Sequence, residues 1–100
     1  NYTQMETRRL DLVFDLAYGV DLNSVSNAII SIAKEDKRIL LEKDVVVIPT
    51  ISQAAITIDL RFWTKTDEYW DVLADINKNV YDYLVKENIA MPYSKVDIIK

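Results

Sequence analysis

The sequence predicts an α+β fold of the ferredoxin-like type, with the element order β-α-β-β-α-β and a mixed four-stranded sheet that carries two helices on one face. Two segments, at 8–18 and 56–62, alternate apolar and polar residues as half-buried strands do. Two others, which begin near 22 and 66, repeat apolar residues every three or four positions as amphipathic helices do. Right-handed crossovers place both helices on the same face of the sheet.

The first half of the chain predicts a strand, a tight turn and a helix. The apolar side of the strand at 8–18 consists of Leu10, Leu12, Phe14, Leu16 and Tyr18. Gly19, the one glycine of the chain, can take the positive φ of a turn, and Asp21 can accept hydrogen bonds from the first free amides of a helix. The apolar stripe of that helix, which should end between Lys34 and Arg38, consists of Leu22, Val25, Ala28, Ile29, Ile32 and Ala33.

The middle of the chain predicts two strands that pair antiparallel. The β-branched run at 45–48 is typical of a strand, and Pro49 either closes it or keeps it at the edge of the sheet. A short connection at 52–55 leads to the alternating strand at 56–62.

The last third predicts a second helix and a short fourth strand. Thr66 is the expected N-cap, and Asn88 tolerates the left-handed conformation of a helix C-cap. The expected apolar stripe consists of Trp70, Leu73, Ile76, Val80, Tyr83 and Leu84. Pro92 prevents the helix from continuing, and Val96 and Ile98 indicate the fourth strand.

The composition excludes several classes of function. The chain has 100 residues, enough for one domain, and contains neither cysteine nor histidine, which excludes disulfides and thiolate zinc sites and removes the commonest general base. Its net charge of −4 disfavours nucleic-acid binding. No apolar stretch is long enough to span a membrane, and a single glycine cannot build a phosphate-binding loop. We therefore expect no enzyme, no catalytic residue, no cofactor and no metal.

The polar side of the predicted sheet offers the main candidate for a functional surface. Asp11 and Asp15 lie on one face of the first strand with their Cα atoms roughly 13 Å apart, too far to share a proton or one metal ion. Asp59 and Arg61 lie on the polar face of the third strand, where Arg61 should neighbour Asp11 or Asp15. These charges form either a cross-strand ion pair or a face that meets another domain or subunit.

Three aromatic residues, Trp63, Tyr69 and Trp70, cluster around the predicted corner between the third strand and the second helix. They form either a lid on the core or an interface patch, because tryptophan and tyrosine are enriched among interface anchors. A stacking platform for RNA would also need nearby positive charge.

Five stretches, in order and at family spacing, resemble the small-conductance mechanosensitive channels (MscS) in their carboxy-terminal cytosolic α/β domain. They are RRLDLVFDLAYGVDL at 8–22, EDKRIL at 35–40, ITIDLRFW at 56–63, YWDVLADINKNVYDYL at 69–84 and NIAMPYSKVDI at 88–98. The sequence departs from the family pattern at Gly19, Pro49, Asn88 and Ser94, where Asp, Glu, Gly and Gln are common.

The resemblance implies a full-length homoheptameric channel of the cell (inner) membrane, which releases ions and small solutes under hypo-osmotic tension. This domain would lie on the cytoplasmic side and build a vestibule, downstream of transmembrane and β domains of the same chain, without entering the membrane itself. Residues 1–7 would then be a tail or a junction with the upstream β domain, and 8–100 a single α/β domain. A chain that begins Asn-Tyr-Thr-Gln is also expected to be a piece of a longer protein.

The resemblance also assigns residues. Arg8 and Arg9 would mark the junction with the upstream β domain. The possible subunit or domain interface consists of Arg8, Arg9, Asp11, Asp15, Asp59 and Arg61.

Two alternatives follow from the fold order alone. One is a ligand-sensing regulatory module of a soluble protein, and the other is an acylphosphatase-like enzyme, which lacks its phosphate loop here.

Overall fold

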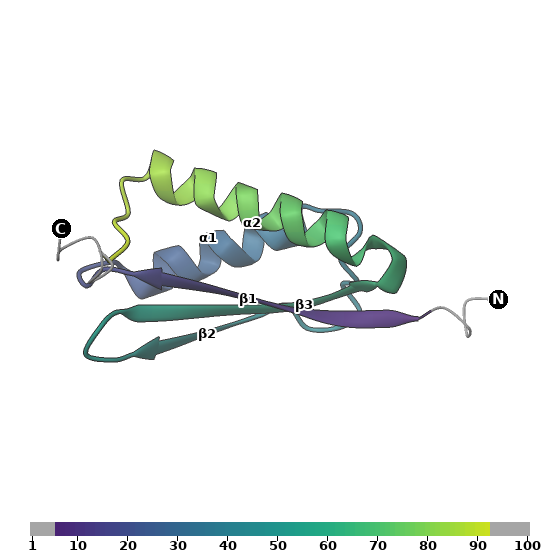
Figure 1. Cartoon of the computed structure of the whole chain (residues 1–100), viewed down its shortest axis with the longest axis horizontal. Helices are drawn as coiled ribbons and strands as arrows, with labels where there is room; N and C mark the ends of the chain where they lie inside the picture. Colours follow the sequence, from purple (N-terminus) through teal and green to yellow (C-terminus); the bar gives the residue numbers. More distant parts are fainter. Residues whose placement is uncertain (1–5, 93–100) are drawn as a thin grey trace, which may run out of the picture.

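A computed structural model describes residues 6–92 of the chain, which form one three-stranded sheet with two helices on one face (Figure 1). The elements in chain order are β1 (Thr7–Leu16), α1 (Leu22–Lys34), β2 (Val46–Ile51), β3 (Ile56–Lys65), the 3₁₀ turn η2 (Thr66–Glu68) and α2 (Tyr69–Lys86). The predicted α+β class and the order of these elements are confirmed. The predicted fourth strand around Val96 and Ile98 lies outside the described residues.

The strand order β1-β3-β2 places β3 in the centre of the sheet, antiparallel to both neighbours. β1 and β2 therefore run in the same direction on either side of β3, and α1 connects them as in a split β-α-β unit. The pairing that would complete a mixed four-stranded sheet falls on residues outside the described range.

The core lies between the sheet and the two helices, and the alternation of the strands builds it. Leu10 pairs with Phe62 and Leu12 with Leu60, so the buried rows of β1 and β3 coincide. Among residues 6–92, the buried members of the core are Leu10, Leu12, Phe14, Leu16, Val25, Ile29, Ala33, Ile39, Ile56, Ile58, Leu60, Phe62, Val72, Ile76, Val80 and Leu84. Burying an aliphatic or aromatic side chain of this size stabilises a fold by about 1.5–3 kcal/mol, so this layer dominates the stability of the domain.

The start of α1 confirms the predicted turn and cap. Gly19 has a φ of 100°, in the region that favours glycine. The backbone N–H of Ser24 donates to Oδ1 of Asp21 over 3.2 Å, so the Asp21 side chain satisfies one of the free amides at the start of the helix.

The end of α2 confirms the predicted role of Asn88, which has a φ of 56°. The N–H of Ile89 donates to the carbonyl of Leu84 over 2.9 Å, and the N–H of Asn88 donates to that of Val85 over 3.1 Å. This pair of hydrogen bonds is the Schellman arrangement, in which a left-handed residue ends the helix.

Three predictions of local structure are wrong. Thr66 does not cap α2, because η2 intervenes and the helix begins only at Tyr69, without a side-chain cap. Tyr18 is 55% exposed, because β1 ends at Leu16 and the chain turns away from the core there. Trp70 is 70% exposed, because the helical repeat turns Val72 toward the core instead.

The two later strands are longer than predicted. β3 continues to Lys65, three residues beyond the predicted segment, and its alternation of buried and half-buried residues persists as far as Thr64. β2 runs through Pro49 as far as Ile51. Pro49 is tolerated because β2 pairs with β3 alone among the described strands, so the missing N–H falls at an edge, as predicted.

Among the described residues, no helix combines the length and the apolar character that a membrane crossing requires.

A candidate interface on the open face of the sheet

The two helices cover one face of the sheet, and no described element covers the other face (Figure 1). We call this second surface the open face. Along β1 and β3 it consists of the residues that alternate with the buried ones, and along β2 of their cross-strand partners. Its members include Arg9, Asp11, Val13, Asp15, Val46, Ile48, Thr50, Thr57, Asp59, Arg61 and Trp63.

Strand alternation places five of the six predicted interface residues on the open face, namely Arg9, Asp11, Asp15, Asp59 and Arg61. Arg8 points to the side of the helices, where its guanidinium carbon lies 3.8 Å from the ring centroid of Tyr69. The two adjacent arginines therefore serve different surfaces of the domain.

The ion pairs of the open face run along the strands rather than across them. Arg9 Nε lies 3.0 Å from Asp11 Oδ1, and an outer guanidinium nitrogen of Arg61 lies 2.9 Å from Asp59 Oδ2. Arg61 stands directly opposite Asp11 in the register, as predicted, but its hydrogen bond goes to Asp59. The predicted cross-strand ion pair is thus replaced by pairs between residues two apart on one strand.

The electrostatics of Arg61 follow from this arrangement. The hydrogen bond and the charge of Asp59 raise the pKa of Arg61, and the charge of Asp11 across the strand adds a smaller contribution. Asp15, the fifth charged residue of the face, accepts a hydrogen bond of 2.9 Å from the hydroxyl of Thr57 on the neighbouring strand.

The centre of the open face also holds unmet hydrogen-bonding capacity. Asp59 Oδ1 and Arg61 Nε are both buried and have no hydrogen-bond partner among the described residues. Buried polar atoms without a partner cost free energy and are uncommon in folded proteins. Both atoms lie in the middle of the face, on side chains whose charged ends are partly exposed.

Apolar side chains surround this polar centre. Val13 is 59% exposed, and Val46 and Ile48 on β2 are 39% and 38% exposed. Beyond them Trp63 is half-buried, with the Lys43 ammonium 4.4 Å from its ring centroid. A mixture of aromatic, arginine and aliphatic side chains is typical of protein interfaces. The sequence analysis overlooked Val13 as an indication of an interface, although it is an apolar residue on the polar side of an alternating strand.

The predicted aromatic cluster is divided between two surfaces. Trp63 lies on the open face, whereas Tyr69 and Trp70 form an edge-to-face pair at the start of α2, with centroids 4.9 Å apart. The longer β3 and the η2 turn separate the two groups. The reading of these residues as a single core lid is therefore wrong for Trp70, which stands in solvent.

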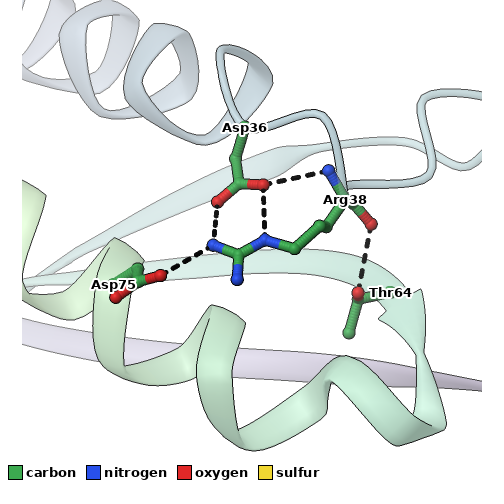
Figure 2. Close-up of polar contacts among 4 residues, drawn as sticks. All are labelled: Asp36, Arg38, Thr64 and Asp75. Atoms are coloured by element: carbon green, nitrogen blue, oxygen red, sulfur yellow. Dashed lines mark hydrogen bonds and ion pairs between the residues drawn. The ribbon is translucent and has the colours of Figure 1, made fainter.

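A second polar cluster, which sequence reasoning missed, joins the loop after α1 to α2 and β3. Figure 2 shows Arg38 in a two-point contact with Asp36 at 2.6 and 2.9 Å and in a third contact with Asp75 at 2.8 Å. The buried hydroxyl of Thr64 donates to the carbonyl of Arg38 over 3.1 Å. The EDKRIL stretch could have predicted this cluster, because it places the opposite charges of Asp36 and Arg38 two residues apart.

We call Asp36, Arg38, Thr64 and Asp75 the clasp. It is a structural feature rather than a binding site, because its charged groups are already paired with one another. The hydrogen bond from Arg38 is the largest of the effects that lower the pKa of Asp36, and the two carboxylates raise the pKa of Arg38. Among residues 6–92 no three acidic side chains gather closely enough to hold a metal ion.

Comparison with known proteins identifies relatives of this arrangement. The family model described as mechanosensitive ion channel MscS, C-terminal, matches residues 10–91. An uncharacterized MscS family protein of Buchnera aphidicola (subsp. Baizongia pistaciae) is 27% identical over 103 residues, which cover 98% of this chain and 35% of the relative. The small-conductance mechanosensitive channel of Edwardsiella ictaluri is 24% identical over 99 residues, which cover 98% of this chain and 35% of that protein.

Solved structures share the fold. The crystal structure of Helicobacter pylori MscS in its closed state superposes with a TM-score of 0.81 at 19% identity, and covers 89% of this chain and 36% of that one. The cryo-EM structure of Arabidopsis thaliana MSL1 superposes with a TM-score of 0.76 at 10% identity, and covers 92% of this chain and 36% of that one. The chain thus spans about a third of the length of the proteins that it matches.

Proposed function

The chain belongs to the MscS family of mechanosensitive ion channels, as a C-terminal domain of that family, and from this premise we propose that it forms part of the wall of a cytosolic vestibule. The observation that carries the proposal is the match over residues 10–91, which reaches from the first strand to beyond the end of α2. The family consists of membrane channels and is not an enzyme family.

In the proposed channel, this domain lies on the cytoplasmic side of the inner membrane, downstream of transmembrane and β domains of the same chain. The segment 1–7 is a tail or the junction with the upstream β domain and leads into β1, whose first residue is Thr7, and 8–100 belong to one domain. Seven copies assemble, and membrane tension opens the pore so that ions and small solutes leave during hypo-osmotic shock. The match to a C-terminal family model supports this order of domains.

We propose the open face as a surface that meets a neighbouring domain or subunit, with Arg9, Asp11, Asp15, Asp59 and Arg61 as its polar residues. The exposed aliphatic side chains beside them and the unpartnered Asp59 Oδ1 support this assignment. Arg8 belongs to the junction at the end of the domain where β1 begins. Fold order alone suggested a ligand-sensing module of a soluble protein, but family membership favours the channel.

Expression of the full-length gene in bacteria that lack their own mechanosensitive channels tests the proposal. Survival of an abrupt osmotic downshock should be restored, and tension applied to membrane patches should open a conductance. A matched control gene that ends before residue 8 should lose both readouts. Failure of the full-length protein to rescue, although it is present in the membrane, would contradict the channel function.

A further inference from the structure

We infer that this domain packs beside a second copy of the same chain through two different surfaces, an exposed stripe of α2 on one copy and the β2 side of the next. The inference rests on the proposed function and deepens it by naming the contacting surfaces. Both surfaces are distinct from the polar centre of the open face, and the second shares with that face only its β2 edge, Val46 and Ile48.

The first surface is a second apolar stripe along α2, separate from the stripe that faces the core. Trp70, Tyr81 and Val85 are 70%, 55% and 56% exposed. With the exposed Ala74 and Asn77 they repeat at intervals of three and four residues, which puts them on one flank of the helix. We call these five residues the outer stripe; it carries no charge and extends over about 22 Å of helix.

The clasp shows which way the outer stripe points. Asp75 bonds to Arg38 on the loop that follows α1, so the flank of α2 with Asp75 faces α1. At about 100° per residue, Asp75 and the outer stripe lie on opposite flanks, each roughly 120° from the buried stripe. Because α1 packs on β2 and α2 packs on β1, the outer stripe faces away from β2.

The second surface lies at the opposite side of the domain. We define the β2 side by Leu41, Val46, Ile48 and Ile51, whose exposed fractions are 61%, 39%, 38% and 67%. A shallow groove between α1 and the segment 41–47 adjoins these residues. Pro49 interrupts the N–H donors of this edge, so addition of another strand is disfavoured and packing through side chains is the mode that remains.

Charge favours contact between the two different surfaces over contact between two like ones. The start of α2, beside Trp70, carries Asp67, Glu68 and Asp71, and none of these three is in an ion pair with another described residue. The groove on the β2 side carries Lys34 and Lys43 against one carboxylate, Asp44. A twofold contact through α2 would oppose acid to acid, whereas the proposed contact opposes acid to base.

A contact between two different surfaces on opposite sides of a subunit propagates from copy to copy and ends only when a ring closes. One domain then contributes its outer stripe to one neighbour and its β2 side to the other. This geometry leaves the centre of the open face available to the interior of the ring or to another domain.

Cysteine cross-linking tests the inference directly, because the chain contains no cysteine. Tyr81→Cys and Leu41→Cys, the latter on the β2 side and outside the open face, are introduced into the full-length protein, separately and together, with any cysteine outside this chain replaced. A short bismaleimide should convert the double variant into a ladder of covalent oligomers. Coexpressed single variants should give dimers only, and each single variant alone should remain monomeric. Tyr81→Cys combined with Val13→Cys on the open face is the matched control and should not cross-link.

Two results would overturn the inference. Covalent dimers from Tyr81→Cys alone would show a contact between like surfaces, and cross-links to Val13→Cys instead of Leu41→Cys would show that α2 meets the open face. Absence of any cross-link in cells that survive osmotic downshock would also overturn it while leaving the channel function intact. Loss of downshock survival by the cysteine-free protein itself would instead count against the proposed function.

Discussion

At the scale of single residues, the two faces of β1 differ most clearly at Phe14 and Val13. Phe14 is 8% exposed and belongs to the core, whereas Val13 is 59% exposed on the open face. We expect Phe14→Ala to lower the free energy of unfolding by about 3–4 kcal/mol, because it leaves a cavity, and Val13→Ala to lower it by less than about 0.5 kcal/mol. Urea denaturation of the isolated domain measures both values. Equal losses would contradict the assignment of the two faces.

The clasp at Arg38 predicts a pH dependence. Arg38 lowers the pKa of Asp36 in the folded protein, so the contribution of Asp36 to stability is complete above the ordinary carboxyl pKa of about 3.9. That contribution disappears as the pH falls through the lower folded-state value. Urea unfolding of the wild type and of Asp36→Asn should therefore differ at pH 5 and converge toward pH 2.

A matched control for this prediction is Asp75→Asn. Asp75 contacts the same guanidinium, but its side chain is 57% exposed, whereas that of Asp36 is 13% exposed. Surface ion pairs contribute little, so the effect of Asp75→Asn should be smaller at every pH. A difference between wild type and Asp36→Asn that stayed constant from pH 5 to 2 would contradict the assigned titration.

Residue-level prediction from the sequence worked where the deciding interaction is local. Asp21 and Gly19 act within a few residues of themselves, and both were identified correctly. Trp70 was misplaced because the repeat of Ile76, Val80 and Leu84 continues to Val72, which leaves Trp70 on another flank of the helix. The bond from Arg38 to Asp75 spans 37 residues, so only the folded chain reveals it.

At the scale of elements, the end of α2 makes a sharp prediction. Asn88 has a φ of 56°, a conformation that most residues adopt at a cost of about 1–2 kcal/mol and glycine adopts freely. Asn88→Gly should leave the free energy of unfolding unchanged or raise it slightly, whereas Asn88→Ala should lower it by about 1 kcal/mol. Thermal or urea unfolding of the two variants would contradict the left-handed cap if alanine were tolerated as well as glycine.

The pattern of each element was readable from the sequence, but the length of the strands was not. Alternation located the buried rows of β1 and β3 correctly, because one face of each strand packs on the helices. β3 extends to Lys65 because β1 begins at Thr7, directly opposite it, so the partner rather than the local sequence sets its end. Pairing across the sheet is a long-range property, and a local pattern does not encode it.

At the scale of the whole molecule, the open face is the surface that we propose for contact with a neighbouring domain or subunit. Its rows combine Asp11 with Arg61 and Val46, and Val13 with Asp59 and Ile48, so charged and apolar side chains alternate on one exposed surface. The sequence placed the charges on this face by strand alternation alone. Which domain or subunit covers the open face depends on other domains or copies, so the sequence of this chain alone does not predict it.

A lysine at position 13, beside the polar centre of the open face, should impair assembly of the channel without impairing folding of the domain. Val13 is 59% exposed, so Val13→Lys should change the free energy of unfolding of the isolated domain by less than about 0.5 kcal/mol. In the full-length protein the same lysine would be buried against the proposed neighbour and would stand beside Asp59 and Arg61, whose buried atoms already lack partners. We therefore expect fewer assembled channels in detergent extracts and poorer survival of osmotic downshock. Asn27→Lys, at an exposed position of α1 outside the open face, the outer stripe and the β2 side, provides the matched control for an added positive charge. Wild-type assembly and survival of Val13→Lys would mean that the centre of the open face stays in solvent, and the interface assignment of its charged residues would then be wrong.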